Sequence, residues 1–227
     1  MIILTGASGG IGKEIISHLL KIDCVVGIYN KSVPKSQKNK KMIYEELNLE
    51  DSTNIKSFIR KWYDKLTKVT IIHFAASNID GLAANYEESD WDHVMGVNLR
   101  GNFLLTQALI PHMIQERWGR IIHISSVVGM CGPPGTIAYS TSKTGLIGMS
   151  GVLAKEYARF NITSNILVLG YFEVGLINTL QAEKKKQIMN QIPSKTLGKV
   201  SNIVNAIDFL MKSEYVNGAT INIDGGL

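Results

Sequence analysis

Apolar residues follow two different rhythms along this chain. Short runs rich in β-branched residues are separated by longer segments in which apolar residues recur every third or fourth position. The short runs are typical of strands buried on both faces, and the longer segments are typical of amphipathic helices. The predicted strands are Ile2–Thr5, Cys24–Tyr29, Met42–Leu47, Val69–Ala75, Arg120–Ser125, Ile162–Leu169 and Ala219–Ile223.

Helices are predicted between these strands. Ser89 followed by Asp92 resembles a capping box, so we expect one of them to begin there. The alternation predicts an α/β fold in which one doubly wound, seven-stranded parallel sheet has helices on both faces. Residues 171–199 break the alternation, and we interpret this polar, lysine-rich segment as a cover over the substrate. The predicted helices are Ile11–Lys21, Ser52–Leu66, Ser89–Leu99 continuing into Asn102–Arg117, Ile137–Arg159 and Asn202–Met211.

Length and composition narrow the class of protein. A chain of 227 residues, 45% of them hydrophobic, suits one domain with a large core, so we expect residues 1–227 to form a single unit. No apolar run approaches the roughly 20 residues that cross a bilayer, and the N-terminus lacks a secretory pattern. We therefore expect a cytoplasmic protein that does not bind membranes. The two cysteines, Cys24 and Cys131, lack the spacing of a metal site, and no metal is expected.

The net charge of +5 comes partly from two lysine-rich stretches. We interpret both as solvated surface, because neither is interleaved with aromatic residues or accompanied by a nucleic-acid-binding motif. No nucleic-acid partner is therefore expected. The first stretch could also attract a phosphorylated cofactor. The two stretches contain Lys31, Lys35, Lys38, Lys40 and Lys41, and Lys184, Lys185 and Lys186.

A glycine-rich turn follows the first predicted strand and reads Thr5-Gly6-Ala7-Ser8-Gly9-Gly10-Ile11-Gly12. A strand, a glycine-rich turn and a helix N-terminus in succession place backbone N–H groups and the positive end of a helix dipole against a pyrophosphate. Taken alone, such a turn is also compatible with a tight structural connection. The predicted dinucleotide contacts here are Gly6, Ser8, Gly10, Ile11 and Gly12.

The end of the second predicted strand indicates which dinucleotide is bound. An NAD site usually has an acidic side chain here, which accepts a hydrogen bond from the ribose 2′-hydroxyl and would repel a 2′-phosphate. This chain has Tyr29, followed by Asn30 and Lys31. We therefore predict NADP(H) rather than NAD(H), with Asn30 and Lys31 at the phosphate. The alternative is that Lys31 only faces solvent.

A second group of polar residues is predicted at the carboxyl edge of the sheet. The fifth predicted strand runs into Ser125 and Ser126, and a predicted helix beyond it carries Tyr139 and Lys143. Residues four positions apart share a helix face, so both side chains would point toward the serines. A phenol titrates near ~10, and a nearby ammonium would lower that pKa enough for proton exchange with a carbonyl oxygen. Ser126 would stabilise the developing oxyanion, although an exposed helical pair is the alternative interpretation.

These motifs together resemble the short-chain dehydrogenase/reductase family, and the C-terminal stretch 217–226 is similar to the end of 3-oxoacyl-carrier-protein reductases. The resemblance implies a Rossmann-type fold and the catalytic roles of Ser126, Tyr139 and Lys143. It also implies that Lys143 binds the nicotinamide ribose and that Asn98 holds a water leading to this lysine. Dimers or tetramers are implied as well, through the helices predicted at Asn102–Arg117 and Ile137–Arg159.

Further cofactor contacts follow from the same resemblance. Asn48-Leu49 stands where relatives have Asp-Val beside the adenine, and His73-Phe74-Ala75-Ala76 stands where they have Asn-Asn-Ala-Gly. Relatives often read Pro-Gly and then threonine at the carboxamide, where this chain has Leu169-Gly170 and Val174, so backbone groups near Phe172 would take over. His73 is expected to be a core residue. The implied contacts are Asn48, Leu49, Ala75, Ala76, Tyr139, Lys143, Gly170 and Phe172.

Three functions are compatible with this pattern. The first is an NADP(H)-dependent ketoreductase that converts a ketone, such as a small-molecule or carrier-bound 3-oxoacyl thioester, to a secondary alcohol. The second is an oxidoreductase of a sugar or nucleotide-sugar, suggested by His73-Phe74-Ala75-Ala76. The third is an NADP-binding regulator without catalysis, which the presence of Ser126, Tyr139 and Lys143 disfavours.

Overall fold

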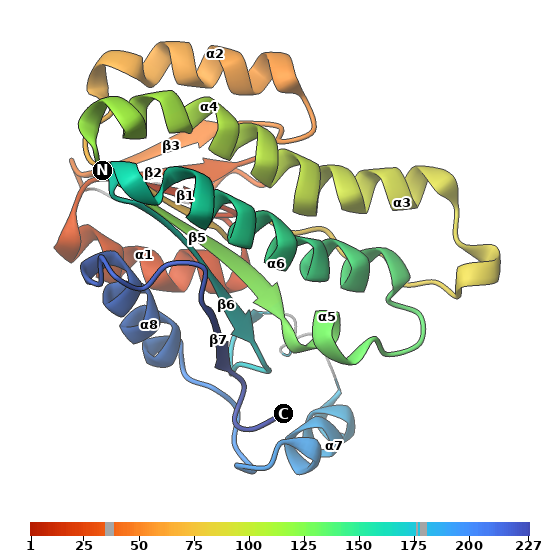
Figure 1. The fold of residues 1–227 in the computed structure, drawn as a ribbon. Helices are drawn as coiled ribbons and strands as arrows, with labels where there is room; N and C mark the ends of the chain where they lie inside the picture. Colours follow the sequence, from red (N-terminus) through yellow and green to blue (C-terminus); the bar gives the residue numbers. More distant parts are fainter. Residues whose placement is uncertain (35–38, 176, 178–180) are drawn as a thin grey trace.

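A single parallel sheet organises the protein. The computed structural model describes residues 1–34, 39–175, 177 and 181–227, so Lys35 and Lys38 lie outside the described residues. The seven strands have the order β3-β2-β1-β4-β5-β6-β7, and each neighbouring pair is parallel (Figure 1). The direction of winding reverses between β1 and β4, which confirms the doubly wound fold. The strands are β1 (Ile2–Thr5), β2 (Val25–Tyr29), β3 (Met42–Glu46), β4 (Thr70–His73), β5 (Gly119–Ser126), β6 (Ile162–Leu169) and β7 (Thr220–Ile223).

Helices cover both faces of the sheet. α1 and α8 lie on one face, and α2, α4 and α6 lie on the other (Figure 1). A short π-helical segment, η3 (Gly96–Arg100), joins α3 to α4. The helices are α1 (Gly10–Ile22), α2 (Ser52–Trp62), α3 (Glu88–Met95), α4 (Gly101–Glu116), α5 (Val127–Cys131), α6 (Ile137–Tyr157), α7 (Ala182–Gln191) and α8 (Val200–Lys212), with short 3₁₀ turns at Tyr63–Lys65, Ala83–Asn85 and Ala158–Phe160.

Side chains of consecutive strand residues pack into two separate hydrophobic cores, one on each face of the sheet. In β1, Ile2 and Leu4 pack with α1 and α8, whereas Ile3 packs with α2 and α4. A third cluster joins α6 to β5 and β6 through residues such as Leu146 and Val168. Because side chains alternate between the faces of a strand, a continuous apolar run is what a sheet covered on both sides requires.

Two local predictions differ from the structure, and one short helix was not predicted. The predicted capping box is wrong, because α3 begins at Glu88 after Glu87, so Ser89 lies inside its first turn. The helix predicted across residues 89–117 is interrupted by η3. α5 was not predicted, although Ser126 caps it by accepting a hydrogen bond from the Val128 N–H at 3.2 Å.

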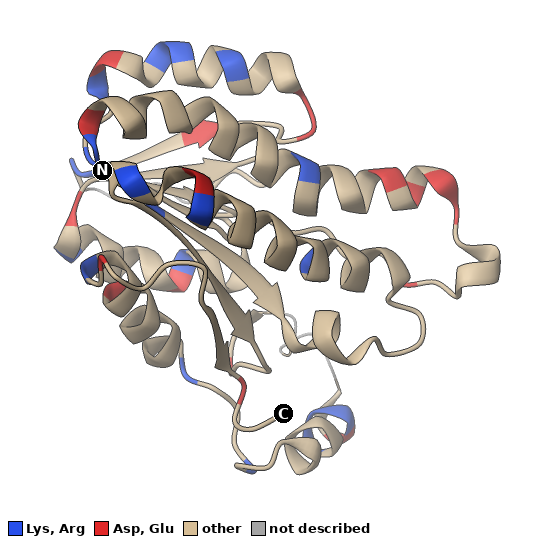
Figure 2. Cartoon of the chain, in the orientation of Figure 1, with Lys and Arg blue, Asp and Glu red and all other residues tan. Residues whose placement is uncertain are grey.

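The described part of the segment 171–199 includes a helix, α7, so the segment is not wholly irregular. α7 lies beyond the carboxyl ends of the last strands (Figure 1). Residues 176 and 178–180 of this segment lie outside the described residues. Charged side chains are carried mainly by the outer helices, including the lysines of α7, while the strands are mostly uncharged (Figure 2). In the described part of the chain, none of the helices combines the length and the apolarity needed to cross a membrane.

Candidate active site

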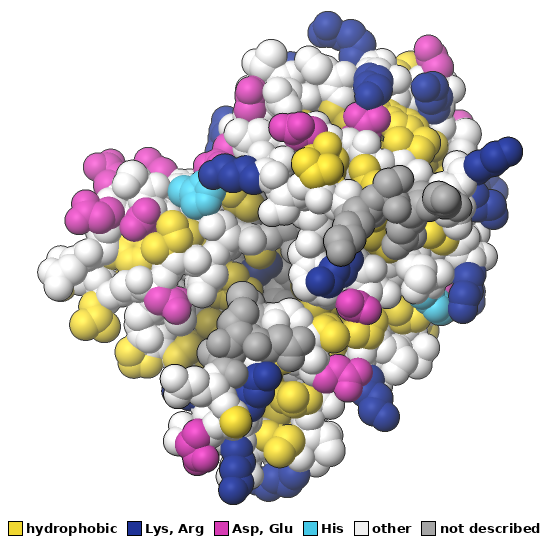
Figure 3. Space-filling model, turned by 180° about the vertical axis from the view of Figure 1, so that it is seen from behind, with side chains coloured by type: hydrophobic (Ala, Val, Ile, Leu, Met, Phe, Trp, Pro, Cys, Tyr) yellow, Lys and Arg dark blue, Asp and Glu magenta, His cyan; other side chains and the backbone are white. Residues whose placement is uncertain are grey.

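A cavity of about 320 Å³ opens at the carboxyl ends of β1, β2 and β4. This edge includes the point where the winding of the sheet reverses, which is where open α/β sheets bind ligands. The surface is hollowed near the centre of the face seen in Figure 3. Several residues predicted to bind the cofactor line the cavity, namely Gly6, Ser8, Asn30, Lys31, Asn48, Leu49, Ala75 and Ala76.

The glycine turn between β1 and α1 is packed too closely to accept side chains. Gly6 has a φ of 70°, and a Cβ added to it would lie 2.8 Å from the Ala75 nitrogen. A Cβ at Gly10 would lie 2.5 Å from the Gly175 Cα, and one at Gly12 would overlap the Gly6 carbonyl oxygen. No described side chain caps α1 at Gly9, and its first turn holds no acidic residue. The cradle therefore fits a pyrophosphate, because backbone N–H groups at a helix start bind anions.

The turn is also tied to the neighbouring strand. Thr5 Oγ1 accepts a hydrogen bond from the Ala75 N–H at 3.0 Å, so the exits of β1 and β4 are fixed to each other. Ala75 and Ala76 then line the cavity floor with small side chains. The turn after β1 therefore supplies backbone groups to the cavity, and the small residues after β4 leave space for a ligand beside them.

The ends of β2 and β3 form the far wall of the cavity. Asn30 and Lys31 are exposed at its mouth, and the described lining contains no aspartate or glutamate. Asn48 Oδ1 accepts a hydrogen bond from the Glu50 N–H at 3.1 Å, which closes a tight turn after β3. The lining at this wall thus combines a lysine with the amide side chains of Asn30 and Asn48.

A second group of polar side chains lies at the same carboxyl edge of the sheet, at the end of β5. It consists of Ser126, Tyr139 and Lys143. Ser126 ends β5, and Tyr139 and Lys143 lie one turn apart on α6. Lys143 Nζ donates to the Ile124 carbonyl at 2.8 Å and lies 5.6 Å from the centre of the Tyr139 ring. The lysine is 2% exposed, so its position is fixed by burial as well as by this bond.

Burial dominates the titration of both groups. Burial raises the pKa of Tyr139 above its ordinary value, and the hydrogen bond with Ser126 acts in the lowering direction. Desolvation lowers the pKa of Lys143 to about 8. Loss of water around the phenol therefore acts against the lowering of its pKa that was expected from Lys143, and that lowering stays a prediction.

The two serines at the end of β5 have different surroundings. Ser125 is buried and its hydroxyl donates to the Lys143 carbonyl at 3.0 Å, so it holds α6 against the strand and is turned away from the cavity. Ser126 is partly exposed and its oxygen is bonded to the first turn of α5. The geometry therefore favours Ser126 over Ser125 as the group that meets a substrate.

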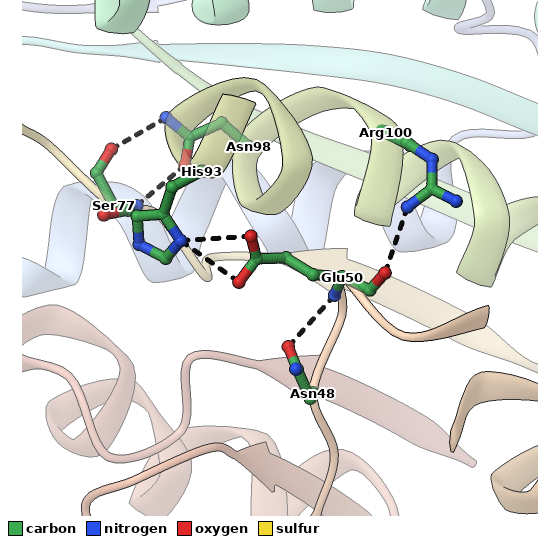
Figure 4. A network of polar contacts seen from close by, with 6 residues as sticks. All are labelled: Asn48, Glu50, Ser77, His93, Asn98 and Arg100. Carbon is green, nitrogen blue, oxygen red and sulfur yellow. Dashed lines mark hydrogen bonds and ion pairs between the residues drawn. The ribbon is translucent and has the colours of Figure 1, made fainter. Parts of the chain in front are cut away.

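Asn98 lies in the π-helical segment η3 and is fully buried. Its Nδ2 donates to Ser142 Oγ at 3.0 Å. Figure 4 shows its two bonds with Ser77, in which Nδ2 donates to the carbonyl at 2.9 Å and Oδ1 accepts from the N–H at 2.7 Å. The asparagine thus reaches the residue before Lys143 on α6. An extra residue in this helical turn is typical of functional positions.

The two residues after β6 that were predicted to contact the cofactor, Gly170 and Phe172, contact other parts of the protein. The Gly170 N–H donates to the Ile223 carbonyl at 3.0 Å, and the Phe172 side chain is buried, with its ring against Gly198. Neither lines the cavity. Gly175, further along, lies against Gly10 and Ile11 of the glycine turn, so this segment crosses the start of α1.

His73 is a core residue, as predicted. It is fully buried, its Nε2 lies 2.9 Å from Thr106 Oγ1, and its ring stacks on His123 with 5.1 Å between ring centres. The pKa of His73 is lowered well below its ordinary value. Burial is the largest cause, and repulsion from His123 and Lys143 adds to it. His73 is therefore neutral at physiological pH.

The cavity includes residues that were not predicted. His93 and Val97 come from α3 and η3, and Phe74 and Ser77 come from the exit of β4. His93 and Val97 are four residues apart, and Val97 directly precedes Asn98. This spacing puts His93 and Val97 on one helix face, but which face meets the cavity depends on how the helix packs in the fold.

The fold and this site have counterparts among known families. The family model for short chain dehydrogenase matches residues 1–185. The chain belongs to the short-chain dehydrogenase family and is an oxidoreductase of that class.

Similar proteins include a 3-oxoacyl-[acyl-carrier-protein] reductase, FabG, from Rickettsia conorii, which is 36% identical over 99% of this chain and 95% of its own. Nodulation protein G from Rhizobium sp. (strain N33) is also 36% identical, with the same coverage of the two chains. FabG from Thermotoga maritima is 38% identical over 80% of this chain and 75% of its own. The similarity to the first two of these relatives therefore extends beyond the residues that the family model matches.

Proposed function

We propose that this protein is an NADP(H)-dependent ketoreductase that converts a 3-oxoacyl thioester to the 3-hydroxyacyl thioester. The observation that carries the proposal is the convergence of Ser126, Tyr139 and Lys143 at the sheet edge that also bears the cavity and the glycine turn. The names of the relatives support the thioester, because two of those described above are 3-oxoacyl-[acyl-carrier-protein] reductases. No feature of the described cavity favours a sugar or nucleotide-sugar in its place.

In this proposal the protein's own groups handle the proton and the oxyanion. A nicotinamide held in the cavity would supply the hydride that the carbonyl carbon receives. Tyr139 keeps its proton at neutral pH, since its pKa is raised, and donates it to the carbonyl oxygen. The Ser126 hydroxyl donates a hydrogen bond to the same oxygen and stabilises its negative charge.

Lys143 has two tasks in this proposal. With a pKa of about 8, it is largely protonated at neutral pH and presents a buried positive charge next to the phenol. It also binds the nicotinamide ribose, while Asn98 holds the water from which the proton is replaced. The bond from Nζ to the Ile124 carbonyl keeps the ammonium at this place before the cofactor arrives.

The proposed cofactor is NADP(H), with the glycine turn at the pyrophosphate and Lys31 and Asn30 at the 2′-phosphate. Glu46 is the nearest acidic residue in register, since it pairs with Tyr29 across β2 and β3, but it does not line the cavity. A lysine at the mouth and the absence of a carboxylate from the described lining both support the phosphorylated cofactor.

A substrate panel tests the proposal. Purified protein is mixed with NADPH or NADH and with acetoacetyl thioester, a simple ketone or an oxidised nucleotide-sugar, and oxidation of the nicotinamide is followed by absorbance. We expect turnover of the thioester with NADPH. Turnover of the sugar alone would overturn the substrate assignment, and nucleotide binding without turnover of any compound would favour a regulator.

We also propose that the protein forms a dimer or tetramer through α4 and α6. Phe103 on α4 and Val152 on α6 are 44% and 54% exposed, so both helices present apolar side chains that a second chain could cover. Gly148 and Gly151 of α6 have no described atom within 4 Å of an added Cβ, so a second helix could approach closely there. Light scattering on the purified protein measures the number of chains.

A further inference from the structure

His93 and Glu50 form a polar pair at the wall of the cavity. His93 Nδ1 lies 3.0 Å from Glu50 Oε1 and 3.1 Å from Oε2, and His93 belongs to the cavity lining (Figure 4). The side chains are 40% and 32% exposed, so the pair can be reached by a ligand without being freely solvated. Neither residue has a task in the ketoreductase chemistry described above.

The position of Glu50 is fixed from several directions. Its N–H donates to Asn48 Oδ1, and its carbonyl accepts from Arg100 Nη1 at 3.0 Å. Gly96 leaves room for its side chain, because a Cβ there would lie 3.1 Å from Glu50 Oε1. The carboxylate is therefore held between the turn after β3 and the helix that carries His93.

This arrangement determines which nitrogen of His93 carries hydrogen. A carboxylate only accepts hydrogen bonds, so Nδ1 must donate to it, and in the neutral ring Nε2 is then an acceptor. A carboxylate that fixes the tautomer of a functional histidine is a common arrangement in proteins. The oxygen of the neighbouring Asn48 is already engaged by Glu50, which leaves the Asn48 amide NH₂ group and the His93 acceptor at this wall.

We propose that His93 recognises the adenine ring of the dinucleotide by accepting a hydrogen bond at Nε2 from the exocyclic amine, and that Glu50 is the positioning residue that fixes this tautomer. The proposal rests on the proposed function, because it requires a dinucleotide in the cavity. It extends that function by assigning the group that distinguishes adenine from a base with a carbonyl at the same position.

The test compares two cofactors that differ only at that edge of the base, where the amine becomes a carbonyl and N1 gains a hydrogen. The dissociation constants of NADPH and of reduced nicotinamide hypoxanthine dinucleotide phosphate, in which a carbonyl replaces the amine, are measured by calorimetry. In the wild type we expect NADPH to bind roughly 3- to 10-fold more tightly, the effect of one hydrogen bond. In His93→Ala we expect the ratio to fall to about one. His18→Ala is the matched control, since His18 also faces a carboxylate, Asp208 at 3.7 Å, on helices that do not line the cavity, and it should keep the wild-type ratio.

Glu50→Gln tests the positioning role. An amide can present either oxygen or N–H to Nδ1, so the ratio should fall between those of the wild type and His93→Ala. Nitrogen-15 NMR of the His93 ring should show hydrogen on Nδ1 in the wild type and a mixture of tautomers in Glu50→Gln. An unchanged ratio in His93→Ala would overturn the assignment while leaving the proposed function intact. Failure of the wild type to bind either dinucleotide would instead remove the proposed function itself.

Discussion

The turn after β1 and the turn after β5 leave the same edge of the sheet but build their parts of the site differently. At the first, function depends on missing side chains, since a Cβ at Gly6, Gly10 or Gly12 would collide with backbone atoms. At the second, function depends on the chemical type of the side chains, because Ser126, Tyr139 and Lys143 differ in what they can donate. The first turn presents a backbone surface and the second presents reactive groups.

The two turns are also held in place by different means. The glycine turn is fixed by direct backbone packing and the Thr5–Ala75 bond. The second turn is fixed against α6 by buried hydrogen bonds from Ser125 to the Lys143 carbonyl and from Lys143 to the Ile124 carbonyl. We therefore expect the first turn to be disrupted by adding a single carbon, and the second by removing a single polar atom.

Removal of the Tyr139 hydroxyl should have the largest effect. Tyr139→Phe keeps the ring and the packing but removes the proposed proton donor, so we expect kcat for ketone reduction to fall roughly 100- to 10,000-fold. NADPH binding should change by less than about 3-fold, because the ring and Lys143 remain. Tyr157→Phe, at the far end of the same helix, is the control and should retain full activity. An unchanged rate in Tyr139→Phe would falsify the acid role.

An added methyl group at the glycine turn should mainly affect stability and binding. In Gly6→Ala the strained backbone costs about 1–2 kcal/mol and the collision with Ala75 about 1–3 kcal/mol more in free energy of unfolding. Gly132→Ala is the matched control, since Gly132 has a φ of 58° but no described atom within 4 Å of an added Cβ. It should show only the backbone cost. Urea denaturation measures both variants, and equal losses would contradict the packing argument.

Lys143 should make stability depend on pH in the alkaline range. Its pKa is lowered from 10.5 to about 8, so between these values the unfolded chain holds a proton that the folded chain lacks, and stability rises with pH. From pH ~8 to ~10 the free energy of unfolding of the wild type should rise by about 2 to 3 kcal/mol relative to Lys143→Met. Above pH ~10 the raised pKa of Tyr139 acts in the opposite direction, because the folded phenol keeps its proton after the unfolded phenol has lost it.

Urea denaturation at several pH values measures this rise. Lys155→Met, on an exposed position of the same helix, should behave like the wild type. If the free energy of unfolding rose with pH no more steeply in the wild type than in Lys143→Met, the buried ammonium would not govern stability in this pH range.

The contrast between the turns also explains what could be predicted from the sequence. The sheet, its strand positions and the layers of helices follow from apolar runs, and the glycine turn and Tyr139–Lys143 pair follow from residue types at fixed spacing. The raised pKa of Tyr139 could not be predicted, because it depends on how completely the fold removes water from the phenol.

The wall formed by His93, Val97 and Glu50 could not be predicted from local spacing either. It brings together the turn after β3 and the middle of the α3–η3–α4 helix, and this contact depends on Gly96 and Gly101 leaving room for Glu50 and Leu49. Likewise, Gly170 and Phe172 lie outside the cavity lining because the chain after β6 is drawn into contacts with β7 and Gly198.

The smallest expected effect concerns Lys31, which lies at the mouth of the cavity beyond both turns. Lys31→Ala should weaken NADPH binding roughly 3- to 10-fold, because an exposed lysine gives a phosphate only a modest, screened attraction. NADH binding should not change, since NADH has no 2′-phosphate. Lys41→Ala removes the same charge from the same basic stretch but from a residue that does not line the cavity, and it should leave both affinities as they are. Equal losses for NADPH and NADH in Lys31→Ala would show that the lysine acts on the cavity as a whole, and the preference for NADP(H) would then need another source.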